Sequence, residues 1–370
     1  MKEENSMDNR NLQENNREQN RVAMRNKYSR YAICIIIFGL ITSGLQLLNS
    51  YVIAPKLGID TDESSWYSFA NILIPMHIVS FGIFLSLNVK QETTVPEKHD
   101  MSIGRFLLCI PLMAGLAGAG AIVGFILNTA LTLPFGVNPS ENTAIAQIMM
   151  DSNPFWRILV AGITAPIVEE LVFRKLLIDR VLKYGELAAI LTSGLMFGLF
   201  HGNFAQFFFA SLIGMFFAFI YVRTGKIQYT IVLHATMNLS TSVITMLTMK
   251  PYLSVDDKLL TQYQDLSTQY FSSGGNPAVE QQLMEVAGQV LPKMVPYLVW
   301  IGFLGQLALA GVVILIILLA KKKFTLKPTA AQVEGGFKTA WGNPGMILFV
   351  IYCIVEFVMN YISIIVNAGK

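Results

Sequence analysis

Two adjacent acidic residues, Glu169 and Glu170, stand inside an apolar segment of this 370-residue chain. Histidines occur in two later apolar segments, at His201 and His234, and Asn238 follows the second of them. Charged and imidazole side chains are costly at the depth of a bilayer, so such a group in apolar helices indicates a working site. Carboxylates and imidazoles can activate water, and imidazole and amide N–H groups can stabilise an oxyanion. The residue types therefore predict hydrolytic chemistry inside a membrane.

The first motif gives its two carboxylates different neighbours. Glu170 and Arg174 are four residues apart, so on a helix they share a face and can form an ion pair that neutralises Glu170. Glu169 points about 100° away from Glu170 and has no local cation, which suits a general base. We predict chemistry at Glu169 and an orienting role for Glu170 with Arg174. The alternative is that both acids are structural members of an ion-pair network.

The other two motifs repeat the four-residue spacing. Phe197 shares a helical face with His201, although a histidine beside aromatic rings can also be a hydrogen-bonded packing residue. His234 shares a face with Asn238, and both can donate to a developing oxyanion. Alternatively, His234 can ligate a metal and Asn238 can link two helices. We interpret His77, in an earlier apolar segment, as a packing or helix-kink residue.

The composition places these motifs in a membrane protein. Apolar residues make up 53% of the chain and charged residues only 14%, with a mean hydropathy of +0.51, far from the values of a soluble domain. The net charge of +3 gives no indication of nucleic-acid binding. The three cysteines lack metal-binding or redox spacing and are interpreted as packing residues. We predict an all-α polytopic membrane bundle of eight or nine transmembrane helices.

The apolar segments and the polar stretches between them define five regions. We expect a disordered polar tail, N-terminal transmembrane helices, a catalytic core, an external loop with short amphipathic helices, and C-terminal transmembrane helices. Their respective bounds are 1–29, 30–152, 153–249, 250–294 and 295–370. Most of the 27 Lys and Arg residues lie in the tail and in alternate connections, which predicts a cytoplasmic N-terminus.

The three motifs, in this order, resemble the CPBP family of intramembrane proteases, which includes the type 2 CAAX prenyl endopeptidases and bacterial Abi-like members. The family pattern is Glu-Glu-x-x-x-Arg, then Phe-x-x-x-His, then His-x-x-x-Asn or Asp, and each element is present here. The intervening sequence at 221–225 also looks like the family's turn between two core helices. The resemblance extends from about residue 153 to 249, and the flanking helices are not diagnostic.

The resemblance implies hydrolysis of a peptide bond in a membrane-associated protein or peptide, including prenylated or CAAX-like ones. Carried over to this sequence, it makes Glu169 the base that activates water with help from His201. His234 and Asn238 would stabilise the oxyanion, and Phe197 would join the ion pair in orienting them.

The resemblance also implies a candidate metal site, because the family is often described as metal-dependent. Glu169, His201 and His234 are the candidate ligands, since two imidazoles and one carboxylate can hold zinc and leave a position for water. Against zinc, the chain has no HExxH spacing and the three ligands come from separate helices. We expect a site that works without a tightly bound metal.

Two other functions fit the same residues. One is a catalytically silent relative that binds a membrane partner, as an immunity or regulatory scaffold protein. The other is a transporter with an ion site, which the lack of paired interrupted helices in two matching halves disfavours. The expected partners are a membrane-associated substrate and the lipid bilayer, not nucleic acid, and the expected location is a bacterial plasma membrane.

Overall fold

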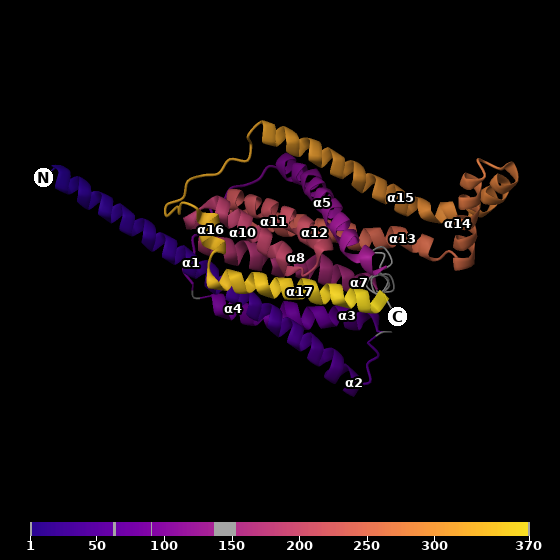
Figure 1. Ribbon diagram of the computed structural model, residues 1–370, viewed down its shortest axis with the longest axis horizontal. Coiled ribbons are helices and arrows are strands. Elements are labelled where there is room, and N and C mark those ends of the chain that lie inside the picture. The colour runs from indigo at the N-terminus through magenta and orange to yellow at the C-terminus, as the bar shows by residue number, and fades with distance from the viewer. Residues whose placement is uncertain (1, 62–63, 90, 137–152, 369–370) are drawn as a thin grey trace.

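The computed structural model describes residues 2–61, 64–89, 91–136 and 153–368. Within these ranges the chain forms helices and no strand. Figure 1 shows the helices running roughly side by side along one elongated bundle, with the two termini at opposite ends. The predicted all-α architecture is confirmed. The last part of the predicted region 30–152, residues 137–152, lies outside the described residues.

The N-terminal part of the bundle consists of five α-helices and three short irregular helical segments. They are α1 (Lys2–Leu48), π-helical η1 (Asn49–Ile53), α2 (Ala54–Lys56), α3 (Ser65–Ile72), π-helical η2 (Leu73–Ser80), α4 (Phe81–Asn88), α5 (Ile103–Thr132) and 3₁₀-helical η3 (Leu133–Phe135).

The central motifs lie on helices that follow one another with few breaks. These are α7 (Pro154–Arg157), π-helical η5 (Ile158–Thr164), α8 (Ala165–Glu170), π-helical η6 (Leu171–Leu176), α9 (Leu177–Val181), 3₁₀-helical η7 (Leu182–Tyr184), α10 (Glu186–Phe200), α11 (Phe204–Thr224), α12 (Ile227–Asn238), π-helical η8 (Leu239–Ile244) and α13 (Thr245–Leu253). The chain ends with α14 (Asp257–Ser272), α15 (Pro277–Ala320), α16 (Gly336–Trp341) and α17 (Pro344–Ala368).

Seven helical stretches in the described ranges are long and apolar enough to cross a membrane. Two further apolar segments, 156–183 and 187–202, are largely helical but differ from the seven. The first contains the acidic and basic residues of the site, and the second is the 15-residue helix α10. Together these features define a polytopic helix bundle whose central helices carry the charged groups.

The prediction of a disordered N-terminal tail is wrong, because α1 is helical from Lys2 onward. Starting a helix is unfavourable, whereas extending an existing one adds a hydrogen bond for each residue fixed. The tail has no Gly or Pro to interrupt it, so it continues the adjacent membrane helix. Met24 and Tyr28, near the end of this region, are fully buried.

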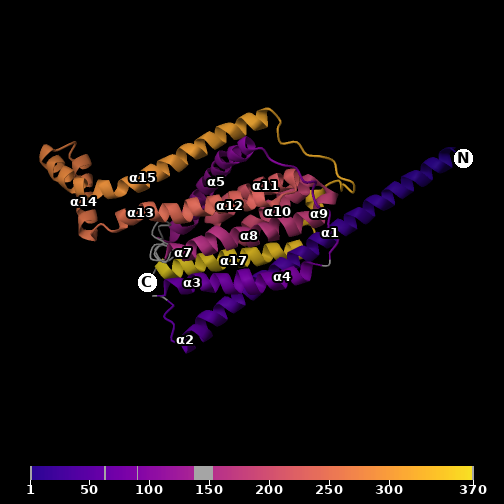
Figure 2. The ribbon, with the colours of Figure 1, turned by 180° about the vertical axis from the view of Figure 1, so that it is seen from behind.

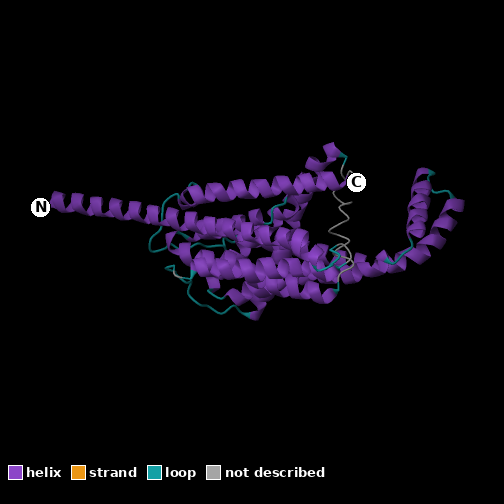
Figure 3. Cartoon of the chain, turned by 90° about the horizontal axis from the view of Figure 1, so that it is seen from below, coloured by secondary structure: helices purple, strands orange, loops and turns teal. Residues whose placement is uncertain are grey.

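The predicted external loop at 250–294 is also more helical than expected. Its amphipathic helix α14 pairs with the first part of α15, which begins at Pro277 rather than at residue 295. A small apolar cluster joins the two helices, formed by Val255, Leu266, Val286 and Val290. Figure 3 shows this hairpin standing away from the bundle, at the end opposite the N-terminus.

Helix α10 ends inside the bundle rather than at its edge. Its 15 residues give a length of about 22 Å, less than the roughly 30 Å of a hydrocarbon core. The chain turns at Gly202, whose φ is +65°, and a Cβ placed there would lie 3.3 Å from the Cβ of Glu356, halfway along α17. This break places the end of α10 beside the middle of α17.

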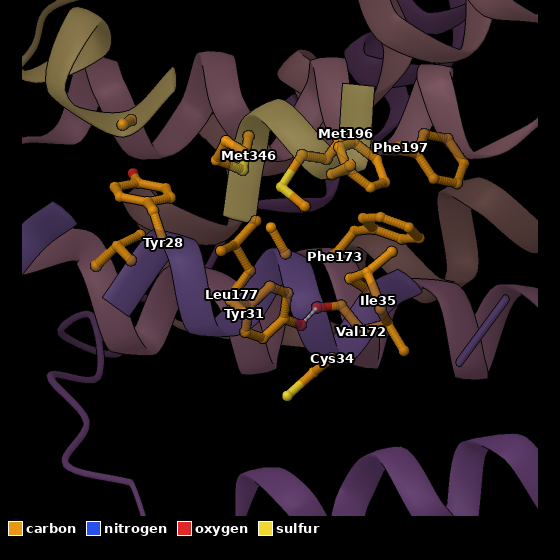
Figure 4. Packing of buried hydrophobic residues seen from close by; sticks show 14 of the residues in the cluster. Tyr28, Tyr31, Cys34, Ile35, Val172, Phe173, Leu177, Met196, Phe197 and Met346 are labelled. Atoms are coloured by element: carbon orange, nitrogen blue, oxygen red, sulfur yellow. Dashed lines mark hydrogen bonds between the residues drawn. The ribbon is translucent and has the colours of Figure 1, made fainter. Parts of the chain in front are cut away.

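The main apolar core joins α1 to the helices that carry the first two motifs. Tyr28, Tyr31 and Ile35 of α1 are buried together with side chains of η6 and α10, as Figure 4 shows. The Tyr31 hydroxyl also donates a hydrogen bond to the carbonyl of Val172, directly after α8. This packing gives the acidic motif a rigid support on the side away from α12.

Helix α15 runs along the outside of the bundle, next to α5 (Figures 1 and 2). The two helices cross closely at Gly115 and Gly311, where a Cβ on Gly115 would lie 2.7 Å from the backbone nitrogen of Val312. A second contact joins Trp300 Nε1 to Thr245 Oγ1 of α13 at 3.1 Å. These contacts hold α15 over the interior of the bundle.

We expect Gly311→Leu to disturb this crossing, because an added Cβ would overlap the carbonyl oxygen of Pro111. Overpacking of this kind costs about 1–3 kcal/mol, which should lower the Tm measured in detergent. Gly302→Leu is the matched control on the same helix, since its added Cβ meets nothing within 4 Å. Equal Tm values for the two variants would show that the crossing is not tightly packed.

Candidate active site

The three motifs meet around the imidazole of His234. On α12, this ring places Nδ1 3.0 Å from Oε1 of Glu170 and Nε2 3.5 Å from Oε2 of Glu169. His234 is 7% exposed and Glu169 is 16% exposed. Each ring nitrogen of His234 therefore faces a carboxylate oxygen, which can accept a hydrogen bond.

The expected ion pair between Glu170 and Arg174 is confirmed. Oε2 of Glu170 lies 3.2 Å from Nε of Arg174, and neither side chain has any exposure. The guanidinium also lies over the rings of Phe197 and Phe217, at 4.4 Å and 5.7 Å from their centroids. Because Arg174 faces aromatic rings on α10 and α11, the pair connects three helices.

Glu169 differs from Glu170 in having no Lys or Arg partner among the described residues. In the described ranges no Lys or Arg forms an ion pair with it, and its partner is the His234 ring. It lies at the end of α8, where Pro166 and Val168 are buried and Glu169 itself faces a cavity. The predicted contrast between the two acids is therefore present in their contacts.

His201 is anchored by the backbone of its own helix. Its Nδ1 lies 2.8 Å from the carbonyl oxygen of Phe197. A carbonyl can only accept, so Nδ1 carries the hydrogen of the neutral ring and Nε2 keeps a lone pair. The edge of the Phe197 ring packs against both His201 and His234, with centroid distances of 4.8 Å and 5.7 Å. Phe197 thus fixes the positions of both imidazoles.

Asn238 uses part of its amide to join α12 to η5. Its Nδ2 donates to the carbonyl oxygen of Ala161 over 2.9 Å, which leaves the second amide hydrogen for another acceptor. Both roles predicted for this residue are compatible with the contact, since it links two helices and also lines the cavity.

A cavity of about 890 Å³ contains the polar groups. Helices α5 and α15 contribute small or apolar side chains to its wall. Its polar lining includes His77, Glu169, His201, His234 and Asn238. A large, mostly apolar cavity with a few convergent polar groups is typical of a ligand-binding site.

Four of the π-helical segments adjoin this cavity or its charged support. The segments η2, η5 and η8 contribute lining residues, and η6 carries Arg174. Such segments are rare and often occur at functional sites. Their clustering here is independent of the sequence motifs.

His77 also lines the cavity, although the sequence interpretation did not include it among the candidate site residues. We expected a packing or kink residue, but it lines the same cavity as Glu169 and bonds to Thr164 across two helices. The cost of an imidazole in an apolar span applies to it as much as to the other two histidines. This cost is the sequence feature that could have indicated His77, although no motif partner lies near it in the sequence.

The proposed zinc ligands have suitable atoms but do not gather. Both His201 and His234 are anchored through Nδ1, as metal-binding histidines often are. However, the described residues contain no group of three His, Cys, Asp or Glu side chains placed to hold a metal ion. This arrangement does not fit a three-ligand zinc site.

The fold and the site define a polytopic helical membrane protein with a buried carboxylate–imidazole cluster. Residues 151–240 match the family described as type II CAAX prenyl endopeptidase Rce1-like. Over 160 residues the chain is 31% identical to a Bacillus subtilis (strain 168) protein named "Putative membrane peptidase YdiL". This likeness covers 40% of the chain and 64% of that relative's length, and no solved structure matches.

The matched segment contains all three motifs and most of the helices that bound the cavity. This match agrees with the family resemblance that the motifs indicated. The helices outside the segment, including α1, α15 and α17, supply the surrounding core and the outer wall of the cavity.

We expect Arg174→Ala to destabilise the protein strongly. The substitution leaves the fully buried Glu170 carboxylate without its cation, and breaking a buried pair costs about 3–5 kcal/mol. Thermal unfolding in detergent should show a large fall in Tm. The exposed pair of Arg21 and Glu18, 3.9 Å apart, offers a control, because Arg21→Ala should leave the Tm unchanged. Similar Tm values for the two variants would contradict a supporting role for the buried pair.

Proposed function

We propose that this protein is an intramembrane endopeptidase that hydrolyses a peptide bond of a membrane-associated protein or peptide. The observation that carries the proposal is the Glu169 carboxylate, which faces an apolar cavity and lies 3.5 Å from His234 Nε2. A carboxylate beside imidazoles in such a cavity can activate water. The family match supports the same reaction.

In the proposed mechanism, water binds between Glu169 and His201. The unprotonated Nε2 of His201 accepts a hydrogen bond from the water and orients it. Glu169 then takes a proton as the water oxygen attacks the scissile carbonyl carbon. As the C–N bond breaks, Glu169 returns this proton to the leaving nitrogen, giving a carboxylic acid and an amine.

Two donors are available for the oxyanion formed in the attack. His234 is held beside Glu170 through Nδ1, and its Nε2, when it carries a hydrogen, can donate into the cavity. Asn238 is held by Ala161 and can donate its second amide hydrogen. Because both donors are anchored by other groups, they need little reorganisation during the reaction, which is the condition for effective oxyanion stabilisation.

The lining of the cavity suits a substrate that enters from the bilayer. Small side chains of α5 and α15, among them Ala114, Gly118 and Ala308, leave room beside the polar groups. We propose a membrane-embedded peptide segment as the substrate, with prenylated CAAX-like peptides as one group to be compared. We further propose that the N-terminal end of the bundle faces the cytoplasm of a bacterial cell, in keeping with the Lys and Arg distribution.

We expect Glu169→Gln to abolish cleavage while leaving the Tm nearly unchanged. Loss of a general base lowers rates about 10²–10⁴-fold. The measurement uses purified protein in nanodiscs with a library of membrane peptides, prenylated and unprenylated, and mass spectrometry of the new termini. Glu356→Gln is the control, because Glu356 is also an acid within a membrane helix but does not line the cavity. No new termini from the folded wild type would favour the silent scaffold, and the same new termini from both proteins would exclude Glu169 as the base.

We expect cleavage to continue after treatment with a zinc chelator such as 1,10-phenanthroline. The candidate ligands do not gather around one point, and Glu169 is required as the base. The assay is the same peptide cleavage, before and after chelation and after zinc is restored. Loss of activity on chelation together with recovery on adding zinc would replace the mechanism above with a metal-dependent one.

A further inference from the structure

A third imidazole faces the cavity from a helix that carries none of the three motifs. His77 lies in η2, is 7% exposed and lines the cavity together with Glu169. His77 is therefore placed within the same polar cluster as the proposed base.

The hydrogen bonds of His77 determine which nitrogen is available. Its Nδ1 lies 2.9 Å from Oγ1 of Thr164. The Thr164 hydroxyl lies 3.1 Å from the carbonyl oxygen of Val160. When it donates its only hydrogen there, its oxygen is the acceptor for Nδ1–H of His77. Nδ1 of the neutral ring is thus protonated, and Nε2 is an acceptor.

The Nε2 acceptor has no hydrogen-bond partner in the described part of the chain. Because the ring lines the cavity, this lone pair is available to a group that the cavity receives. That group must be a hydrogen-bond donor, because Nε2 of His77 carries only a lone pair in this tautomer. A peptide substrate offers one donor at the reacting bond, the amide N–H.

The backbone around His77 and Thr164 is irregular on both sides of their hydrogen bond. His77 lies in π-helical η2 and Thr164 ends π-helical η5. Two irregular segments on different helices thus meet through this one hydrogen bond. The rarity of π-helical segments and their frequent occurrence at functional sites favour a role for the contact.

We propose that His77 is a substrate-contacting residue whose Nε2 accepts a hydrogen bond from the N–H of the scissile amide. This inference rests on the proposed function and adds the group that orients the leaving nitrogen. Water still adds to the carbonyl carbon and its proton still passes through Glu169 to the nitrogen. His77 holds the existing N–H away from Glu169, so that the nitrogen lone pair can receive that proton as the C–N bond breaks.

Two substitutions test the roles of the two ring nitrogens of His77 separately. An Asn side chain reaches the position of Nδ1 and can donate to Thr164, but it places nothing at Nε2. A Gln side chain can place its carbonyl oxygen near Nε2 and keep an acceptor for the substrate. We expect amide cleavage to fall about ten-fold in His77→Asn, the value of one hydrogen bond, and to be largely retained in His77→Gln.

The decisive probe is a pair of substrates, one membrane peptide that the wild type cleaves and its depsipeptide analogue. The analogue carries an ester oxygen in place of the scissile N–H, so it has nothing to donate to His77. His77→Asn should slow cleavage of the amide but leave cleavage of the ester unchanged, with the effect in kcat. Equal losses on both substrates, or no loss on either, would overturn the proposal.

The same experiment distinguishes this inference from the proposed function. If the wild type cleaves neither substrate, the endopeptidase itself fails and the role of His77 fails with it. If the wild type cleaves both, only the behaviour of the His77 variants decides. Thr164→Val removes the anchor but retains the imidazole, and we expect partial loss on the amide alone. Tm measurements on each variant identify losses caused by unfolding.

Discussion

The buried ion pair between Glu170 and Arg174 is the interaction on which the site depends. Charges without exposure are tolerated only when they are paired and closely surrounded. Here the guanidinium lies over Phe197 of α10 and Phe217 of α11, while the carboxylate holds His234 of α12. A pair formed within one helix therefore fixes the positions of three others, including the two that carry the site histidines.

The pair also explains how two adjacent carboxylates can differ in chemistry. Glu170 has its charge balanced by Arg174 and a ring nitrogen of His234 as a second partner. Glu169 points to the cavity and contacts only the other nitrogen of the same ring among the ion pairs of the described residues. One acid is committed to structure, and the other is left facing the space where a substrate would bind. Their separation by one position on the helix is sufficient for this division.

Local spacing predicted the parts of the site that lie within one helix. The ion pair at positions 170 and 174 and the contact between Phe197 and His201 follow from four-residue spacing, which places side chains on one helical face. The partnership of His77 with Thr164 joins residues 87 positions apart, and no periodic pattern indicates it. The prediction of a disordered tail failed because the polar composition of the tail gives no information about the membrane helix that it continues.

Because α10 ends within the bundle, the polar backbone groups at its end need hydrogen-bond partners. Irregular backbone is tolerated there only where its polar groups are satisfied or face a cavity. Asn203 meets this condition, because its Nδ2 donates to the carbonyl of His201 over 2.8 Å and its Oδ1 accepts from the backbone of Gln206 over 2.9 Å. The same side chain thus closes one helix and begins the next. This local closure allows His201 to line the same cavity as His234, so the position of one imidazole depends on how an asparagine satisfies the backbone groups of a turn.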